Sequence, residues 1–190
     1  MTVLLIFRRL RAMHDAIVVG IGTVLADNPS LTTRLVPGPS PHPVVLDSRL
    51  KCPPTQAIIK ARGKETLGAI LMCSATMDDE MLSRKLALER AGAVVCPYDI
   101  STGLFGALRC VRAKFQHCTF MIEGGASVIT SALQAPKLDR VIITMSPLIV
   151  GGLPSINRPV DLKPVRLKYL HVVPCGGDLL LDCQVETNQS

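Results

Sequence analysis

Apolar stretches of strand length recur along the chain, with polar or helix-like segments between several of them. Continuous runs such as AIVVG and VIIT are rich in β-branched residues, which is typical of strands covered on both faces. Strands alternating with helices predict an α/β fold with a mostly parallel sheet. The expected strands are 16–20, 44–47, 57–60, 69–73, 93–96, 119–123, 140–144, 166–173 and 178–183, and the expected helices are 78–91, 104–114 and 126–133.

Turn signals define the ends of these elements. The stretch Cys175-Gly176-Gly177-Asp178 lies between two strand-like runs, so the sheet is expected to end in an antiparallel hairpin. The segment PGPSPHP over 37–43 predicts a surface loop. No repeat, low-complexity tail or break divides the 190 residues, and residues 1–190 are therefore expected to form a single domain.

The composition excludes several classes of protein. Apolar residues make up 48% and charged residues 19%, which is the balance of a folding chain and not of a disordered one. With no Trp, two Tyr and four Phe, the chain lacks the aromatic rings on which nucleic-acid modules stack bases. No apolar run is long enough for a membrane span or a secretory signal peptide. We therefore expect neither a nucleic-acid nor a membrane partner.

Cysteine usage and charge narrow the picture further. The seven Cys are odd in number and form no C-x-x-C pair, so neither the usual zinc spacings nor a disulfide framework is expected, and we predict no metal and a reducing, cytoplasmic location. The net charge is +6, with basic residues spread along the chain. This charge fits a mildly basic surface, or a set of Arg and Lys that contacts a phosphorylated small molecule.

The first candidate site lies in TFMIEGGASVITSAL over 119–133. A strand ends at Glu123, Gly124 and Gly125 turn the chain, and a helix opens near Ala126 and Ser127. This geometry directs backbone N–H groups and the positive helix end toward a ligand such as a phosphate. A tight strand-to-helix turn without a ligand is the alternative. The pattern is not G-x-G-x-x-G, so a standard Rossmann site is not predicted.

The second candidate site follows the strand AIVVG. Polar residues come after Gly20 and Gly22 in what the pattern predicts to be a loop or short turn, and ligands of open α/β sheets bind beyond the carboxyl ends of strands. For Asp27, a role as a helix or turn cap is the alternative. The polar residues are Thr23, Asp27, Asn28, Ser30, Thr32 and Arg34.

Four segments in this order resemble the reductases of riboflavin biosynthesis: RLRAMHDAIVVGIGTVLADNPSLTTR, VVLDSRL, FMIEGGASVITSAL and VIITMSPLIVGG. The family comprises stand-alone diaminopyrimidine reductases and the C-terminal half of a bifunctional deaminase/reductase. The resemblance implies a dihydrofolate-reductase-like, doubly wound mixed sheet with an antiparallel C-terminal hairpin. It also implies a homodimer.

The resemblance further implies NADPH-dependent reduction of the ribosyl side chain of a phosphorylated pyrimidine to a ribityl chain, with NADH left open as the cofactor. The arginines at the matching positions suit the substrate phosphate. The positions that match cofactor-binding residues are Thr23, Asp27, Ser48, Gly124, Gly125, Ala126, Ser127, Val128, Ile129 and Thr130. Those that match substrate-binding residues are Arg11, Leu31, Arg34 and Glu123.

The implied chemistry needs an acid. The ribosylamine must open before C1′ accepts hydride, and a nearby group then protonates the ring oxygen or nitrogen. The cofactor supplies the hydride and the protein supplies position and electrostatics. Asp27 is the first candidate for the acid, and Glu123 is the second.

Two departures from the family pattern qualify the expectation. The chain has no H-x-E with P-C-x-x-C, which indicates the stand-alone reductase acting on the 2,5-diamino pyrimidine. It begins MTVLLIFRRLR without the A-x-S-L-D-G-like first strand of the family, so that strand is expected to be truncated or replaced. Two alternatives stay open: a dihydrofolate-reductase-like enzyme with another substrate, and an inactive, truncated nucleotide-binding homologue.

Overall fold

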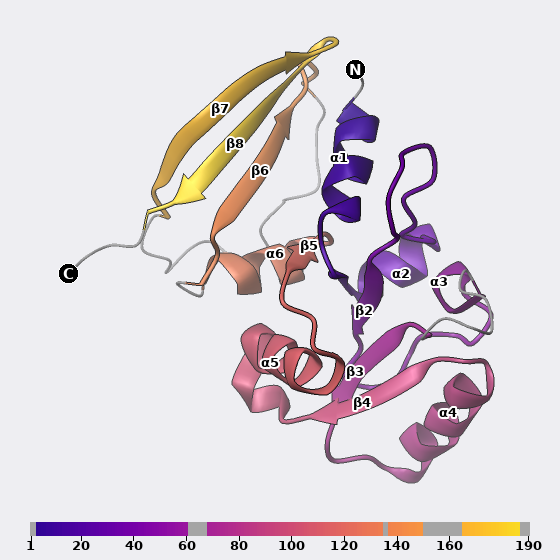
Figure 1. Cartoon of the computed structure of the whole chain (residues 1–190). Coiled ribbons are helices and arrows are strands. Elements are labelled where there is room, and N and C mark those ends of the chain that lie inside the picture. The colour runs from indigo at the N-terminus through magenta and orange to yellow at the C-terminus, as the bar shows by residue number, and fades with distance from the viewer. Residues whose placement is uncertain (1–2, 61–67, 135–136, 150–164, 187–190) are drawn as a thin grey trace.

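The computed structural model describes residues 3–60, 68–134, 137–149 and 165–186. In these residues a five-stranded parallel sheet carries helices on both faces, and a three-stranded antiparallel sheet stands beside it (Figure 1). The predicted α/β class is confirmed. No helix in the described part of the chain is long and apolar enough to cross a lipid bilayer.

The parallel sheet has the strand order β4-β3-β2-β1-β5. Because all its strands run in the same direction, their carboxyl ends meet along one edge, which is where open α/β sheets bind ligands. β1 pairs with both β2 and β5, so the ends of these three strands are neighbours there. The strands are β1 Ala16–Gly20, β2 His42–Leu46, β3 Ile70–Ser74, β4 Val94–Tyr98 and β5 Phe120–Ile122.

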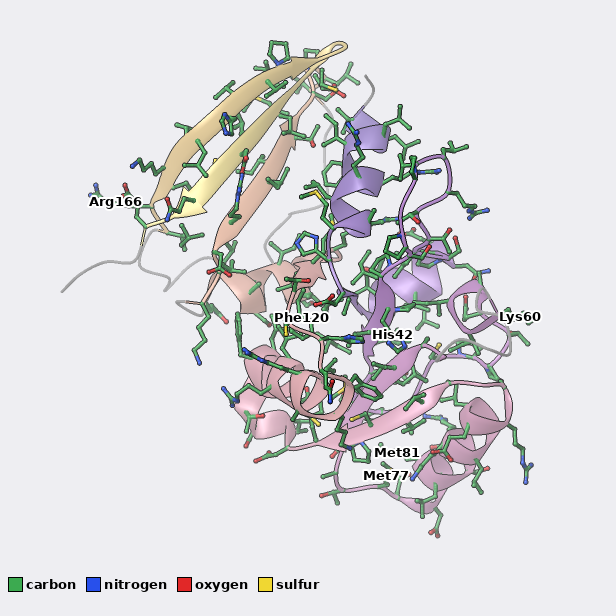
Figure 2. The ribbon with its side chains drawn as sticks, in the orientation of Figure 1. His42, Lys60, Met77, Met81, Phe120 and Arg166 are labelled. Carbon is green, nitrogen blue, oxygen red and sulfur yellow. The ribbon has the colours of Figure 1, made fainter. Side chains whose placement is uncertain are left out.

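Each face of this sheet has its own apolar core. Ile17 and Val19 point to a cluster with residues of α2, α3 and α4, and the alternate residues Ala16 and Val18 point to a cluster with α5 and α6. Met81 of α4 is buried in the first cluster (Figure 2). The helices are α1 Val3–Ala12, α2 Ile21–Asp27, α3 Ala57–Lys60, α4 Asp79–Arg90, η1 Ile100–Thr102, α5 Gly103–Phe115 and α6 Ala126–Leu133.

The antiparallel sheet has the order β6-β8-β7, with β6 at Arg140–Met145, β7 at Leu167–Cys175 and β8 at Asp178–Val185. The predicted C-terminal hairpin is confirmed, and Gly176 takes a positive φ of 66° in its turn. The hairpin was expected at the end of the parallel sheet. It belongs instead to a separate sheet, because an apolar pattern shows that a strand buries one face but not which strand it pairs with.

Two predicted elements were wrong. The apolar residues 57–60 form the single helical turn α3 and not a strand, since a run of four residues fits either element. The Asn28 side chain accepts a hydrogen bond from the Ala57 N–H at 2.7 Å, which caps this turn. The segment after Gly20 was expected to be a loop or short turn. It is the helix α2, which starts directly where β1 ends.

The predicted loop over 37–43 ends earlier than expected, because His42 and Pro43 belong to β2. A proline inside a parallel sheet would leave one ladder position without a donor. Here the His42 N–H donates to the Asp15 carbonyl on the β1 side, and pairing with β3 begins only at Val44. The missing N–H of Pro43 therefore falls where no bond to β3 is needed.

The first strand of the family was expected to be truncated or replaced at the start of the chain. Residues 3–12 form the amphipathic helix α1, which lies between the two sheets (Figure 1). No side chain of α1 is fully buried, and Leu4 is 56% exposed. Among the described residues, β5 pairs with β1 alone. Helix α1 matters to the site because it carries two arginines toward the carboxyl edge of the parallel sheet.

Candidate active site at the carboxyl edge of the parallel sheet

The two candidate sites found in the sequence meet through Thr23. This residue lies in the first turn of α2, beyond the end of β1, and its Oγ1 accepts a hydrogen bond from the Gly125 N–H at 3.0 Å. The two residues are 102 positions apart in the sequence. Their contact follows from the pairing of β1 with β5, which brings both strand ends to the same edge.

Two glycines make this junction sterically possible. Gly124 has a φ of +145°, which side-chain-bearing residues rarely adopt. A Cβ on Gly20 would come within 2.9 Å of Val128 Cγ2, so the absence of a side chain lets α6 pack on the end of β1. The glycine turn thus sets both the direction of the chain after β5 and the position of α6.

Helix α6 has the predicted boundaries, and its N-cap Gly125 offers no side-chain hydrogen bond to its first turn. Val128 and Thr130 are 7% and 6% exposed, and the Thr130 hydroxyl donates to the Ala126 carbonyl at 2.6 Å. Their side chains therefore serve packing within the fold. Gly125 and Ser127 are exposed, so the accessible part of the predicted cofactor segment is the backbone and first turn of the helix.

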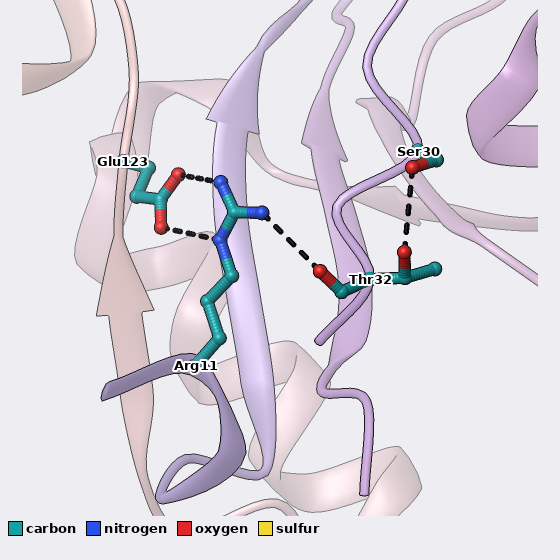
Figure 3. A network of polar contacts seen from close by, with 4 residues as sticks. All are labelled: Arg11, Ser30, Thr32 and Glu123. Carbon is teal, nitrogen blue, oxygen red and sulfur yellow. Dashed lines mark hydrogen bonds and ion pairs between the residues drawn. The ribbon is translucent and has the colours of Figure 1, made fainter. Parts of the chain in front are cut away.

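Arg11 and Glu123 form a bidentate ion pair (Figure 3). Arg11 Nε donates to Glu123 Oε1 at 2.8 Å and Nη2 donates to Oε2 at 2.6 Å, while Nη1 reaches the Thr32 carbonyl at 3.5 Å. The side chains are 20% and 21% exposed, so the pair is partly shielded from water. The structure thus joins two of the predicted substrate residues, from α1 and from the end of β5.

Arg34 forms hydrogen bonds with two hydroxyl groups of the loop that follows α2. Its Nη2 donates to Ser30 Oγ at 2.6 Å and its Nε donates to Thr32 Oγ1 at 3.1 Å. Arg8 Nη1 donates to the carbonyl of Arg34. Neither Arg8 nor Arg34 forms an ion pair with a carboxylate in the described part of the chain, so the loop presents uncompensated positive charge.

The remaining predicted residues occupy three different environments. Asp27 is exposed at the last turn of α2, four residues after Thr23 and hence on the same side of the helix. Ser48 is exposed at the carboxyl end of β2, and its carbonyl accepts from the Ser74 N–H at 3.1 Å. Leu31 is 5% exposed, has a positive φ of 53° and packs in the apolar cluster of α2, α3 and α4.

Arg8 was not predicted to be a site residue, and Ser30 and Thr32 were predicted only as polar residues of the second candidate site, with no individual role. Arg8 and Arg11 are three residues apart, which places both on one side of a helix, but the helix itself was not expected. The apolar start of the chain was judged only as a replacement for the first strand of the family. The helical spacing of Arg8 and Arg11 is the signal that could have identified both as residues of one helix face.

The arrangement suits the binding of an anionic, phosphorylated ligand. The glycine turn, the uncapped start of α6, the Arg11–Glu123 pair and the Arg8–Arg34 loop lie near the carboxyl ends of β1 and β5. In the described residues, no three His, Cys, Asp or Glu side chains gather as metal ligands would. Asp27 adds an exposed carboxylate on the same side of α2 as Thr23.

Comparison with known proteins agrees with this geometry. The sequence model of the family described as RibD C-terminal domain matches residues 4–181. The chain belongs to this family. It is 32% identical over 188 residues to a 2,5-diamino-6-ribosylamino-4(3H)-pyrimidinone 5′-phosphate reductase from Methanothermobacter thermautotrophicus, covering 93% of this chain and 82% of the relative. The predicted resemblance is thereby confirmed.

A solved structure shows the same fold. The Saccharomyces cerevisiae riboflavin biosynthesis reductase Rib7 superposes with a TM-score of 0.71 at 26% identity, over 96% of this chain and 80% of Rib7. The riboflavin biosynthesis protein RibD of Actinobacillus pleuropneumoniae is 29% identical over 90% of this chain, which spans 46% of that relative. This chain therefore spans about half the length of some of its curated relatives and most of others.

Proposed function

We propose that residues 1–190 form one reductase domain, which reduces the ribosylamino side chain of 2,5-diamino-6-(5-phosphoribosylamino)pyrimidin-4(3H)-one to the ribitylamino form in riboflavin biosynthesis, with NADPH as the reductant. One observation carries the proposal. The Thr23–Gly125 junction and the Arg11–Glu123 pair meet at one sheet edge, in a chain similar to a protein named as this reductase.

The residues present fit a dinucleotide. The turn at Gly124 and Gly125 carries no side chain, and α6 starts without a side-chain cap, which suits a phosphate group. Thr23 holds the Gly125 amide in place, and Ser48 offers a hydroxyl along the same edge. When bound, NADPH supplies the hydride, and NADH is the alternative donor.

The substrate phosphate is assigned to the positive loop. Arg34 and Arg8 carry charge that no carboxylate neutralises in the described structure, and guanidinium groups bind phosphate in bidentate fashion. Arg11 is engaged by Glu123, so its role is to fix that carboxylate and to close the side of the site. The buried Leu31 sets the course of the loop backbone between Ser30 and Thr32.

Asp27 is proposed to donate the proton that accompanies opening of the ribosylamine. It is exposed, and no hydrogen bond to its carboxylate is seen among the described residues, so it is accessible both to water and to a bound substrate. Glu123 remains the second candidate. Both of its oxygens accept hydrogen bonds from Arg11, so this carboxylate is engaged in the ion pair, whereas that of Asp27 is not.

The test is substrate-dependent oxidation of NADPH by the purified chain, with the phosphoribosylamino pyrimidine as substrate. The expected result is turnover to the ribitylamino product, identified by mass spectrometry. The same assay with the dephosphorylated substrate should show a raised KM. Binding of NADPH without turnover under any condition would contradict the proposed activity and favour the inactive homologue.

We further propose that the chain forms a homodimer through the antiparallel sheet. Several apolar side chains of this sheet are exposed, which is more than a lone antiparallel sheet usually shows to water. Consecutive strand residues point to opposite faces, so a second copy packed against this sheet would cover those on the face that it contacts. They are Met145 at 53%, Tyr169 at 64%, Leu170 at 38%, Val172 at 53%, Val173 at 39% and Leu179 at 39% exposed.

A further inference from the structure

Two cysteines face each other between the strand β4 and the helix α5. Cys96 Sγ and Cys110 Sγ lie 3.6 Å apart, within hydrogen-bonding distance for sulfur, and both thiols are free. We propose that they form a reversible oxidation site, in which a hydroperoxide converts the two thiols to a disulfide that joins β4 to α5. The inference goes beyond the proposed reductase activity and does not depend on it.

The fold places both side chains in one apolar cluster. Cys96 is 1% exposed in the core between the parallel sheet and α5, and Cys110 packs against the same core while staying partly exposed. A disulfide holds its sulfurs about 2.05 Å apart, so this pair must close by about 1.5 Å. Rotation about the Cα–Cβ bonds covers such a distance, and β4 and α5 already pack together.

Two other cysteines are placed where they do not compete for Cys96. Cys73 lies on the neighbouring strand β3, but its side chain belongs to the apolar cluster on the opposite face of the sheet. Cys118 precedes β5, which is at the other edge of the sheet from β4, and its Sγ donates to the Gln116 carbonyl at 3.6 Å. The geometry therefore favours pairing of Cys96 with Cys110.

Lys114 supplies a positive charge beside the buried sulfur. It follows Cys110 by one turn of α5, and its ammonium forms a hydrogen bond with the Cys96 sulfur. Burial raises the pKa of the Cys96 thiol and the hydrogen bond with Cys110 raises it further, whereas the Lys114 ammonium opposes both effects. A cation in this position stabilises the thiolate that forms while Cys96 reacts.

The reaction balances with one hydroperoxide. The thiolate of the partly exposed Cys110 attacks a peroxide oxygen, so that an S–O bond forms, the O–O bond breaks and hydroxide leaves. The Cys96 sulfur then attacks the sulfur of this sulfenic acid: the S–S bond forms, the S–O bond breaks, and the departing hydroxide takes the Cys96 proton as water. Two electrons pass from the sulfurs to the peroxide, and with hydrogen peroxide the products are the disulfide and two waters. A dithiol reverses the oxidation through a mixed disulfide.

The disulfide fastens an edge of the molecule. β4 is the last strand on its side of the parallel sheet, and the two cysteines are 14 positions apart in the sequence. A cross-link that closes a loop of this size stabilises the fold by restricting the unfolded chain. We therefore expect the oxidised chain to unfold at a temperature about 5 °C higher than the reduced chain.

The experiment treats the full chain with hydrogen peroxide, blocks the remaining thiols with iodoacetamide and maps the tryptic peptides by mass spectrometry. Trypsin cleaves after Arg90, Arg109 and Arg112, so Cys96 and Cys110 fall on the separate peptides 91–109 and 110–112. The expected product is these two peptides joined, with two hydrogens fewer than their sum. Dithiothreitol should separate them and reverse the rise in unfolding temperature.

Two pairs of variants separate the roles of the residues. Cys110→Ser should abolish both the joined peptides and the temperature shift, whereas the control Cys118→Ser, at an exposed cysteine, should keep both. Lys114→Gln should slow disulfide formation about tenfold, the effect of one pKa unit on a thiolate population. Arg112→Gln is its control, since Arg112 is also exposed on α5.

The peptide map of the wild type decides the central point even if Cys110→Ser fails to fold. Peroxide that converts Cys110 to a sulfinic acid without joining the two peptides, or that joins either cysteine to a different one, would overturn the site. Equal rates of disulfide formation in Lys114→Gln and the wild type would overturn the role of Lys114. None of these measurements uses NADPH or the pyrimidine, so they stand apart from the test of the reductase activity.

Discussion

The Thr23 hydroxyl is the smallest group on which the geometry of the site depends. It accepts from the Gly125 N–H and so joins the start of α2 to the turn before α6. Gly125 is exposed, so water can also accept a hydrogen bond from its N–H. The Thr23 hydroxyl differs from water in that its position is fixed by α2. At the scale of single residues, the site is therefore held by hydrogen bonds between segments that are distant in the sequence.

Replacing Thr23 with Val removes the acceptor and keeps the shape of the side chain. We expect the free energy of unfolding to fall by about 1 kcal/mol and the dissociation constant of NADPH to rise, because the glycine turn loses its anchor. Urea unfolding and fluorescence titration measure the two effects. Thr23→Ser keeps the hydroxyl and should behave like the wild type; a Val variant with unchanged NADPH binding would contradict the anchoring role.

Replacing Asp27 with Asn removes the proposed acid and keeps its size. We expect kcat to fall about 100-fold or more, because general acid catalysis contributes on this scale. The thermal unfolding temperature should change little, since Asp27 is exposed. Glu123→Gln is the comparison: if it lowers kcat while Asp27→Asn keeps full turnover, the two carboxylates have been assigned the wrong way round.

At the scale of elements, Asp15 connects the start of β1 to the chain before β5. Its Oδ2 accepts from the Cys118 N–H at 2.8 Å, the Thr119 N–H at 2.9 Å and the Thr119 hydroxyl at 2.9 Å. Hydrogen bonds from the backbone N–H groups of Thr119 and Cys118, followed by the Thr119 hydroxyl, lower the pKa of Asp15 below its ordinary value of 3.8. One carboxylate thus fixes the register of the β1–β5 pair on which the site depends.

Asp15→Asn should therefore lower the stability of the fold in a pH-dependent way. Because the folded-state pKa is lowered, the carboxylate contributes stability above about pH 3.8, and this contribution disappears as the pH falls through the folded-state value. Near neutral pH we expect a loss of about 1 kcal/mol or less, since Asp15 is exposed and solvent screens it. Urea unfolding from neutral to acidic pH checks this.

The matched control for this series is Asp139→Asn, since Asp139 is exposed and its carboxylate makes no hydrogen bond seen in the described residues. It should change stability little at any pH. A stability difference between Asp15→Asn and the wild type that stays constant down to pH 3 or below would show that the three hydrogen bonds do not depend on the charge.

At the scale of the whole molecule, the two sheets have different surroundings. The strands β1 to β3 of the parallel sheet are almost entirely buried between helices, whereas β7 is exposed along most of its length. This contrast is the basis for the proposed homodimer. The apolar area of the antiparallel sheet is available for a second copy, while the parallel sheet keeps its carboxyl edge open for ligands.

Val172→Lys places a charge in this exposed apolar area and should convert the homodimer to a monomer, because an unpaired charge is costly in a packed interface. Light scattering coupled to size-exclusion chromatography measures the mass. Leu86→Lys is the control, since Leu86 is also exposed, at 54%, but lies on α4, which packs on the parallel sheet and not in the proposed interface. A wild type that is monomeric at all concentrations, or a dimer that tolerates Val172→Lys, would contradict an interface at this sheet.

The extent to which the sequence predicted the fold depends on the element. Continuous apolar strands such as β1 and the helix α6 were found with their correct bounds, because burial on both faces and the glycine turn leave clear local patterns. Residues 57–60 and the start of α2 were not, since four apolar residues suit a strand or a helix and two glycines suggested a loop. The residues of the candidate site came mainly from resemblance to a family.

The sequence by itself determined the α/β class, the glycine turn with its helix and the C-terminal hairpin, because these depend on residues close together in the chain. Only the tertiary structure decided that Arg11 meets Glu123 across 112 positions, that Arg8 joins Arg34 and that the hairpin belongs to a second sheet. Contacts of this kind depend on which strands pair and how helices pack. Local apolar patterns carry no information on that choice.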